Sequence, residues 1–176
     1  MKQELRQVKS TDECAIAKLP ENKPLNRFRN ILPYDFNRVE LTGKHNYINA
    51  SHILMNVGEM EAHYIAAQGP LPDTSYDFWQ MIWEQNVSVI AMLTLDVENG
   101  KVKLYKLSLL RVQSLEHFEI REIMIENRPM GTGRLVYHFM FTNWPDQTAP
   151  DTRPLLQDQY TLSYLACLDA LRSLSS

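Results

Sequence analysis

The most constraining feature of this sequence is an almost uninterrupted apolar run from Val87 to Leu95. Such a run is typical of a strand buried on both faces, because a strand with one wet face alternates polar and apolar residues. A strand of this kind needs neighbouring strands and covering helices. The run therefore predicts a layered fold with a central sheet.

A helix is predicted immediately before this run. Apolar and aromatic residues recur there at helical spacing, and we expect this stripe to lie in the core. The residues of the stripe are Phe78, Trp79, Met81, Ile82, Trp83 and Gln85. Thr74 is the predicted N-cap, with Asp77 three residues on in a variant of the capping box, and Asn86 is the predicted helix end.

Strand patterns dominate the rest of the chain. The predicted strands cover 46–51 and 62–67, joined as a hairpin with Gly58 in its turn, and 101–104, 118–125 and 134–141. A short helix is predicted around 3–9, and a terminal amphipathic helix is predicted over 156–174. The pattern predicts an α+β fold in one domain of 176 residues, with an N-terminal arm (1–25), a sheet and helix region (26–150) and a terminal helix (151–176).

Composition excludes several function classes. A net charge of -3 without a Lys/Arg run argues against nucleic acid as the main partner. No apolar run reaches the ~18 residues that suggest a membrane span, and the polar opening lacks a signal peptide's apolar core. Cys14 and Cys167 fit a reduced compartment and form no metal-ligand spacing, so we expect no disulfide, metal or cofactor.

One candidate catalytic group follows the 134–141 strand. Pro145 forbids further ladder pairing, which leaves Asp146 on a loop beside the large apolar anchor Trp144. An acid on a hinged loop is a candidate proton donor. Trp-Pro-Asp is also an ordinary turn sequence, so this tripeptide alone does not decide between an acid loop and a plain turn.

Several separated motifs together resemble the catalytic domain of the protein tyrosine phosphatases. They are Asn26-Arg27-Phe28, Tyr47-Ile48-Asn49-Ala50-Ser51, Tyr64-Ile65-Ala66-Ala67-Gln68-Gly69-Pro70 with Asp77-Phe78-Trp79, and Trp144-Pro145-Asp146. The resemblance covers roughly 19–150, and the helix containing Tyr160 resembles the family's last helix. The sequence of residues 68–85 is most similar to that of the non-receptor, cytosolic members, especially those that carry membrane-cytoskeleton-linking domains.

The resemblance implies roles for particular residues. Phe28 would stack on the substrate's phenyl ring, and Asn30 replaces the family's usual Asp, which weakens positioning of the peptide backbone. Glu98 and Lys103 match a loop that lies against the family's active site. Asp146, supported by Trp144 and Pro145 in the family's mobile acid loop, would be the general acid that protonates the leaving tyrosyl oxygen.

The family's nucleophile signature, His-Cys followed by five residues and Arg, does not occur in this sequence. The residue six beyond Cys14 is Pro20, and the residue six beyond Cys167 is Ser173. Cys167 lies inside an amphipathic pattern, which is typical of a core cysteine. Residues 151–154 lead almost directly into the predicted last helix, so a large block of the family's sequence is absent between them. A second, smaller block of the family's sequence is absent after Tyr105.

The sequence therefore predicts an incomplete tyrosine-phosphatase-like fold: a twisted mixed sheet with flanking helices that lacks the central strand and several C-terminal helices. We expect a catalytically inactive, pseudophosphatase-like chain of splice-product type. The open alternatives are an active phosphatase with an unrecognised nucleophile, and a non-catalytic interaction or dominant-interfering module. Expected partners are phosphotyrosyl proteins, bound weakly, and further copies of the chain through exposed sheet edges. The expected location is cytoplasmic, with cytoskeleton or membrane association through regions of other isoforms.

Overall fold

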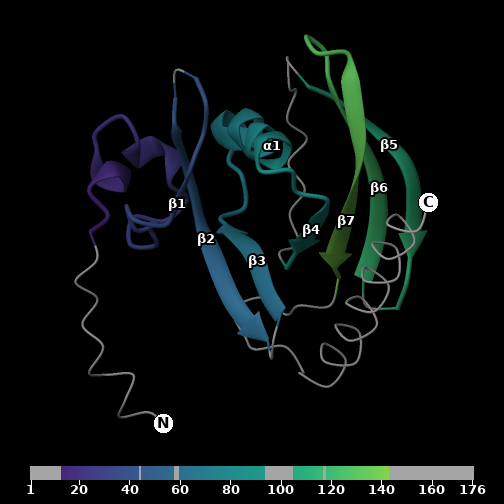
Figure 1. Ribbon diagram of the computed structural model, residues 1–176, viewed down its shortest axis with the longest axis horizontal. Coiled ribbons are helices and arrows are strands. Elements are labelled where there is room, and N and C mark those ends of the chain that lie inside the picture. The colour runs from purple at the N-terminus through teal and green to yellow at the C-terminus, as the bar shows by residue number, and fades with distance from the viewer. Residues whose placement is uncertain (1–12, 44, 58–59, 94–104, 117, 143–176) are drawn as a thin grey trace. The chain divides into compact units, whose positions relative to one another are not determined.

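The computed structural model describes residues 13–43, 45–57, 60–93, 105–116 and 118–142 (Figure 1). Its helices are η1 (Ile16–Lys18), η2 (Lys23–Leu25), η3 (Pro72–Thr74) and α1 (Ser75–Glu84). Its strands are β1 (Arg38–Glu40), β2 (Tyr47–Val57), β3 (Met60–Ala67), β4 (Val89–Met92), β5 (Tyr105–Ser114), β6 (Phe118–Asn127) and β7 (Thr132–Phe141). The strand predicted at 101–104 and the helices predicted at 3–9 and 156–174 lie outside the described residues.

The architecture is α+β, with seven strands and four helical elements in the described part of the chain. Two sheets form, one of order β1-β2-β3 and one of order β4-β7-β6-β5. The chain divides into two compact units, of which the first holds 1–88, 97–107 and 125–134 and the second the remainder. Among the described residues, no helix is long and apolar enough to cross a bilayer.

The antiparallel sheet β1-β2-β3 and helix α1 form the first unit's core. Buried side chains come from β1, from the start of β2 and from the middle of α1. They are Val39, Tyr47, Ile48, Ala50, Met81 and Ile82. The predicted 46–51 and 62–67 hairpin is confirmed, and both strands are longer than predicted because they continue to Val57 and begin at Met60.

Helix α1 begins and ends close to the predicted residues. Asn86 adopts the left-handed conformation (φ 51°) and ends the helix, as predicted. The predicted capping interaction of Thr74 is wrong, because its hydroxyl accepts the Leu71 N–H at 2.8 Å within η3 and caps no α1 amide. The aromatic members of the stripe are half-buried, whereas Met81 and Ile82 are buried, as are Ser75 and Gln80 of the same helix.

Arg134 holds the C-terminal end of α1 within the first unit. Its guanidinium donates to the carbonyl of Val87 at 2.5 Å and to the carbonyl of Ile82. The same group lies over the Trp83 ring, 5.6 Å from the centroid. Burial lowers the pKa of Arg134, yet the carbonyls at a helix C-terminus and the aromatic face both favour a cation there.

Strand β4 lies parallel to β7, with Val89 opposite Tyr137 and Met92 opposite Met140. The prediction that this segment is buried on both faces is wrong: Val89 is 42% exposed and Leu93 is 51% exposed. Among the described strands β4 has only β7 as a neighbour, so one of its edges and much of its side-chain surface lack cover.

Candidate functional site

The loop that begins at Asn26 is fixed by a polar network centred on that residue. The Asn26 amide nitrogen donates to the carbonyls of Ala17 at 3.1 Å and Asn22 at 3.0 Å. Its amide oxygen accepts the Tyr47 hydroxyl at 2.5 Å and the Asn49 amide at 2.9 Å. All the hydrogen-bonding groups of the Asn26 side chain are therefore used in positioning the loop.

Two β2 residues carry this network into the core. The Tyr47 side chain is buried, and desolvation raises its pKa to about 12, with the hydrogen bond to Asn26 acting in the opposite direction. Asn49 is also buried and donates a second bond to the carbonyl of Ile31 at 2.8 Å. Asn49 thus fixes both ends of the segment 26–31.

The segment after β3 fixes the same loop from another side. The Gln68 amide oxygen accepts the Arg27 N–H at 2.9 Å, and the Gln68 amide nitrogen donates to the carbonyl of Leu25 at 2.9 Å. The Arg27 guanidinium donates to the carbonyls of Gly69 at 3.1 Å and Pro70 at 2.9 Å. Arg27 therefore acts here as a structural clamp on the 68–70 segment.

This framework leaves Phe28 with 58% of its surface exposed, and Asn30 is exposed on the same loop. A fixed backbone that presents a free aromatic ring suits stacking on a flat apolar group, because little ordering remains to be done on binding. The amide of Asn30 is neutral, so it offers hydrogen bonds without charge. Both residues lie on the loop that follows Asn26, and their substrate-binding roles stay predictions.

The remaining predicted site residues are outside the described part of the chain. They are Glu98, Lys103, Trp144, Pro145 and Asp146. Strand β7 does run to Phe141 and leads toward the Trp-Pro-Asp segment, as predicted. The roles of these five residues stay predictions.

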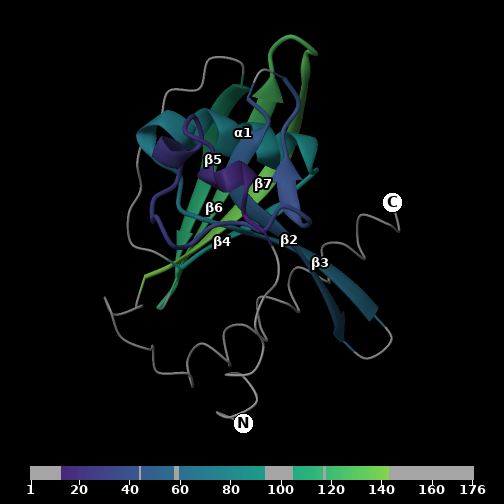
Figure 2. The ribbon, with the colours of Figure 1, turned by 90° about the vertical axis from the view of Figure 1, so that its left-hand side faces the viewer.

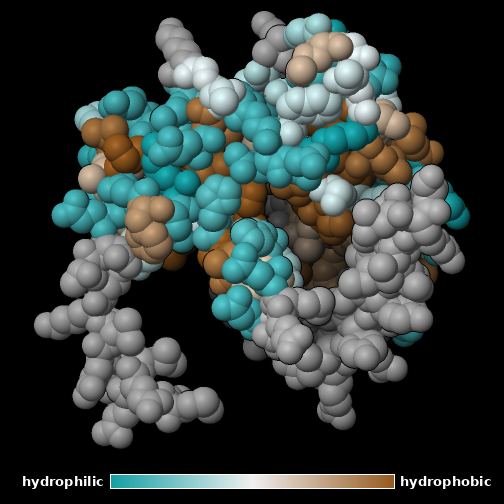
Figure 3. Space-filling view, viewed as in Figure 1, coloured by the Kyte–Doolittle hydropathy of each residue, from teal (hydrophilic) through white to brown (hydrophobic). Residues whose placement is uncertain are grey.

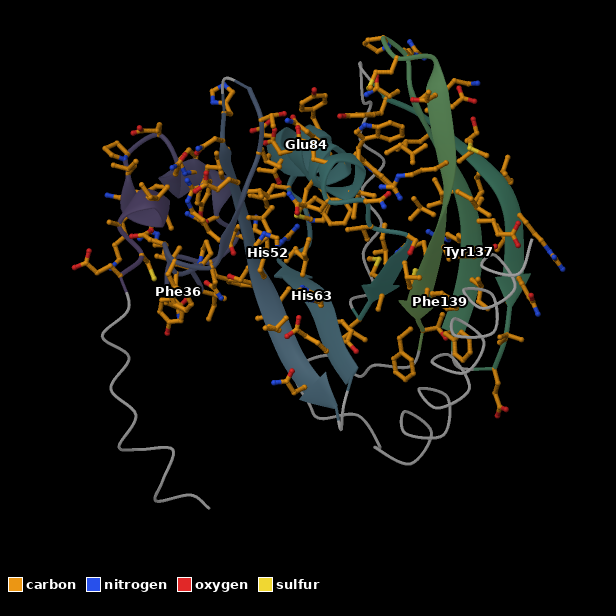
Figure 4. All side chains as sticks on the ribbon, viewed as in Figure 1. Phe36, His52, His63, Glu84, Tyr137 and Phe139 are labelled. Carbon is orange, nitrogen blue, oxygen red and sulfur yellow. The ribbon has the colours of Figure 1, made fainter. Side chains whose placement is uncertain are left out.

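An open hollow of about 540 Å³ lies elsewhere on the first unit. Its lining comes from the segment before β1 and from the β2–β3 hairpin, and Figure 4 shows the labelled members Phe36, His52 and His63. The full lining is Phe36, Asn37, His52, Ile53, Leu54 and His63. It includes neither a cysteine nor an arginine, so it lacks a thiolate and a guanidinium for phosphoryl transfer. No cluster of His, Cys, Asp or Glu among the described residues has the geometry of a metal site.

The anchoring residues Asn26, Asn49 and Gln68 were not predicted as functional from the sequence. One signal was available: Asn49 stands between Ile48 and Ala50 in a strand whose neighbours are buried, and a buried amide requires partners. What the sequence did not specify is that the partner is the Phe28 loop, about twenty residues earlier.

Comparison of the sequence with known proteins identifies the family of the chain. The protein-tyrosine phosphatase family model matches residues 22–173. The chain belongs to the protein-tyrosine phosphatase family. Its α+β architecture is consistent with an incomplete version of that family's fold, and its relatives are non-receptor members.

The chain is 44% identical over 163 residues to tyrosine-protein phosphatase non-receptor type 13 of Mus musculus, which covers 83% of the chain and 7% of that protein. It is 39% identical to the type 14 protein of Homo sapiens (89% of the chain, 15% of that protein) and 40% identical to the type 20 protein of Mus musculus (84% and 38%). The chain thus spans a minor part of each of these relatives.

Proposed function

We propose that this chain is a single truncated tyrosine-phosphatase domain that does not hydrolyse phosphotyrosine. One observation carries the proposal: neither Cys14 nor Cys167 is followed six residues later by an arginine. Hydrolysis in this family needs a thiolate and an arginine from the same loop, because the thiolate attacks phosphorus while the guanidinium and backbone N–H groups hold the phosphoryl oxygens.

The other half of the reaction machinery is retained in the sequence. Asp146 is proposed as the general acid, with Trp144 and Pro145 supporting its loop, and Glu98 and Lys103 as residues of the adjoining loop. A general acid accelerates departure of the tyrosyl oxygen only when a nucleophile is forming a bond to phosphorus. Without that nucleophile, Asp146 has no step in which to act.

The surviving role is proposed to be non-catalytic binding. The exposed Phe28 ring on its anchored loop favours this role, since it offers a stacking surface for a tyrosyl side chain. Affinity for phosphotyrosine is expected to be low because no phosphate loop is present and Asn30 lacks the negative charge of the family's usual Asp. The chain is proposed to be cytoplasmic, as the non-receptor names of its relatives suggest.

Self-association is the second part of the proposal. Large apolar side chains reach the surface on several strands, and hydrophobic residues are visible among the hydrophilic ones in Figure 3. Leu109, Leu110 and Val112 of β5 are 59%, 57% and 46% exposed. Exposed strands of this composition favour association between chains, with low stability of the isolated chain.

The activity part is tested with purified chain and a phosphotyrosyl peptide, using the catalytic domain of the type 13 relative as positive control. The expected result is no phosphate release above the blank. Release that disappears in Asp146→Asn, Cys14→Ser or Cys167→Ser would establish the active alternative. Release that is unchanged by all three substitutions comes from a contaminating phosphatase, and the assay is then repeated on chain purified by a further step.

A further inference from the structure

Strand β3 is the outer strand of the first unit's sheet. Within the described residues β3 pairs with β2 only, so its other edge has no partner strand there. The distal half of the β2–β3 hairpin extends away from α1 and from η1 and η2 (Figure 2). An edge strand of eight residues in this position is a template for strand pairing.

The register determines which main-chain groups point outward. The Gln68 N–H donates to the Asn49 carbonyl at 3.1 Å, so this pair and every second pair along the hairpin exchange hydrogen bonds across β2 and β3. The His52 N–H donates to the carbonyl of Asn37 at 2.7 Å, on the β1 side, which agrees with this alternation. The N–H and C=O groups of Glu61, His63, Ile65 and Ala67 therefore point to the open edge.

This edge has little of the protection that edge strands usually carry. The segment 60–67 contains no proline or lysine, and the side chains of Glu61 and His63 contact one another, with 3.0 Å between His63 Nε2 and Glu61 Oε1. Tyr64 is 55% exposed, and Leu54 and Met55 of the adjoining strand are 57% and 51% exposed. The edge is thus accessible and flanked by apolar surface on both faces of the hairpin.

We propose that β3 pairs antiparallel with β3 of a second copy of this chain, about a two-fold axis at Tyr64. The proposal rests on the self-association proposed above and specifies its surface. In this register Glu61 lies opposite Ala67 of the second copy and His63 opposite its Ile65. Every outward-pointing main-chain group of 61–67 then has a hydrogen-bonding partner.

Self-complementarity favours a second copy over a foreign strand. The proposed register places no like charges opposite one another, and it sets the two Tyr64 rings side by side at a non-hydrogen-bonded pair, where aromatic pairs stabilise sheets. Shifting the second copy's β3 by two residues in one direction places His63 opposite the second copy's His63 and leaves Ala67 unpaired. Sliding the other way leaves Glu61 unpaired, so the two-fold at Tyr64 uses the edge best.

Disulfide cross-linking of the full chain tests the register. Tyr64→Cys in a Cys14→Ser, Cys167→Ser background places two thiols directly opposite, within the Cα separation that a disulfide spans. Glu61→Cys in the same background is the matched control, since the two copies of residue 61 are offset by six residues, about 20 Å. The expected result is a covalent dimer for Tyr64→Cys and almost none for Glu61→Cys. Equal cross-linking of the two variants overturns the proposal.

A substitution at the edge gives an independent test by sedimentation velocity. His63→Pro removes an outward N–H without removing a β2–β3 bond, and we expect the dimer dissociation constant to rise about tenfold or more. His63→Ala, which also loses the pairing with Glu61, is expected to dimerise like the unmodified chain. Dimerisation unaffected by His63→Pro overturns the proposal. A chain that stays monomeric overturns both this and the proposed self-association, whereas one that associates without Tyr64→Cys cross-linking overturns the β3 register alone.

Discussion

The two halves of the β2–β3 hairpin share one pair of strands yet have opposite environments. At the proximal end, Tyr47, Ile48 and Ala50 are 2%, 4% and 1% exposed. At the distal end, Leu54 and Tyr64 are more than half exposed. The proximal half is buried and also anchors the Phe28 loop through Asn49, whereas large apolar side chains of the distal half remain exposed. Strand sequence alone does not determine burial; the neighbouring elements do.

We expect the largest loss of stability from a substitution in the proximal half of the hairpin. Ile48→Ala should lower the free energy of unfolding by about 2–5 kcal/mol, because it leaves a cavity in a packed core. The matched substitution Leu54→Ala, in the distal half of the same strand, should change it by about 0.5 kcal/mol or less. Urea unfolding followed by circular dichroism measures both. Equal losses from the two substitutions would contradict the contrast between the halves.

The next effect tests the polar anchor. Asn49→Ala removes the hydrogen bonds that the buried Asn49 amide donates to Asn26 and to the carbonyl of Ile31, and we expect a loss of about 1–3 kcal/mol because both acceptors lose a partner. Asn56→Ala, an exposed position on the same strand, is the control and should be near neutral. Hydrogen exchange of the 26–31 amides should speed up only in Asn49→Ala.

The stability that Tyr47 contributes to the proximal half depends on pH. Its pKa is raised to about 12, above the value of 10.0 for an exposed tyrosine, so the unfolded chain loses this proton first. The stabilisation from Tyr47 is complete below pH 10 and is lost as the pH rises toward 12. Tyr47→Phe should flatten this part of the stability curve. A slope that is insensitive to Tyr47→Phe would contradict the burial argument.

The smallest expected effect on stability concerns the distal face. Met55→Lys should alter the unfolding free energy by about 0.5 kcal/mol or less, since this side chain is half exposed. It should nevertheless reduce binding of a hydrophobic dye, because a charge interrupts the apolar surface. Dye fluorescence titration against Asn56→Lys as control measures this change. A loss of several kcal/mol would show that the distal half is packed in solution.

Local patterns predicted the hairpin, α1 and β7 because each depends on short-range periodicity and on turn residues such as Asn86. The motifs also placed Phe28 and Asn30 on one loop. The prediction that failed depended on longer-range context: the run beginning at Val87 has the composition of a doubly buried strand, yet β4 pairs with one strand among those that the structure describes and remains half exposed. Composition reports what a strand can bury, not which partner the chain supplies.

The anchoring network shows the same limit at the site. Asn26, Asn49 and Gln68 are ordinary polar residues in the sequence, and their roles depend on contacts across twenty to forty positions. Thr74 shows the same limit at short range, because its hydroxyl accepts the Leu71 N–H at η3 and does not cap an α1 amide. Backbone geometry decides such cases, and residue type alone does not.

The central claim is that this phosphatase-family chain contains no phosphate-accepting nucleophile. The most direct measurement incubates the purified chain with a peptide carrying ³²P-phosphotyrosine, quenches rapidly, and maps protein-bound label by mass spectrometry. The catalytic domain of the type 13 relative, treated in the same way, serves as positive control. We expect no label on Cys14 or Cys167, and phosphate trapped on either cysteine would contradict the proposed inactivity.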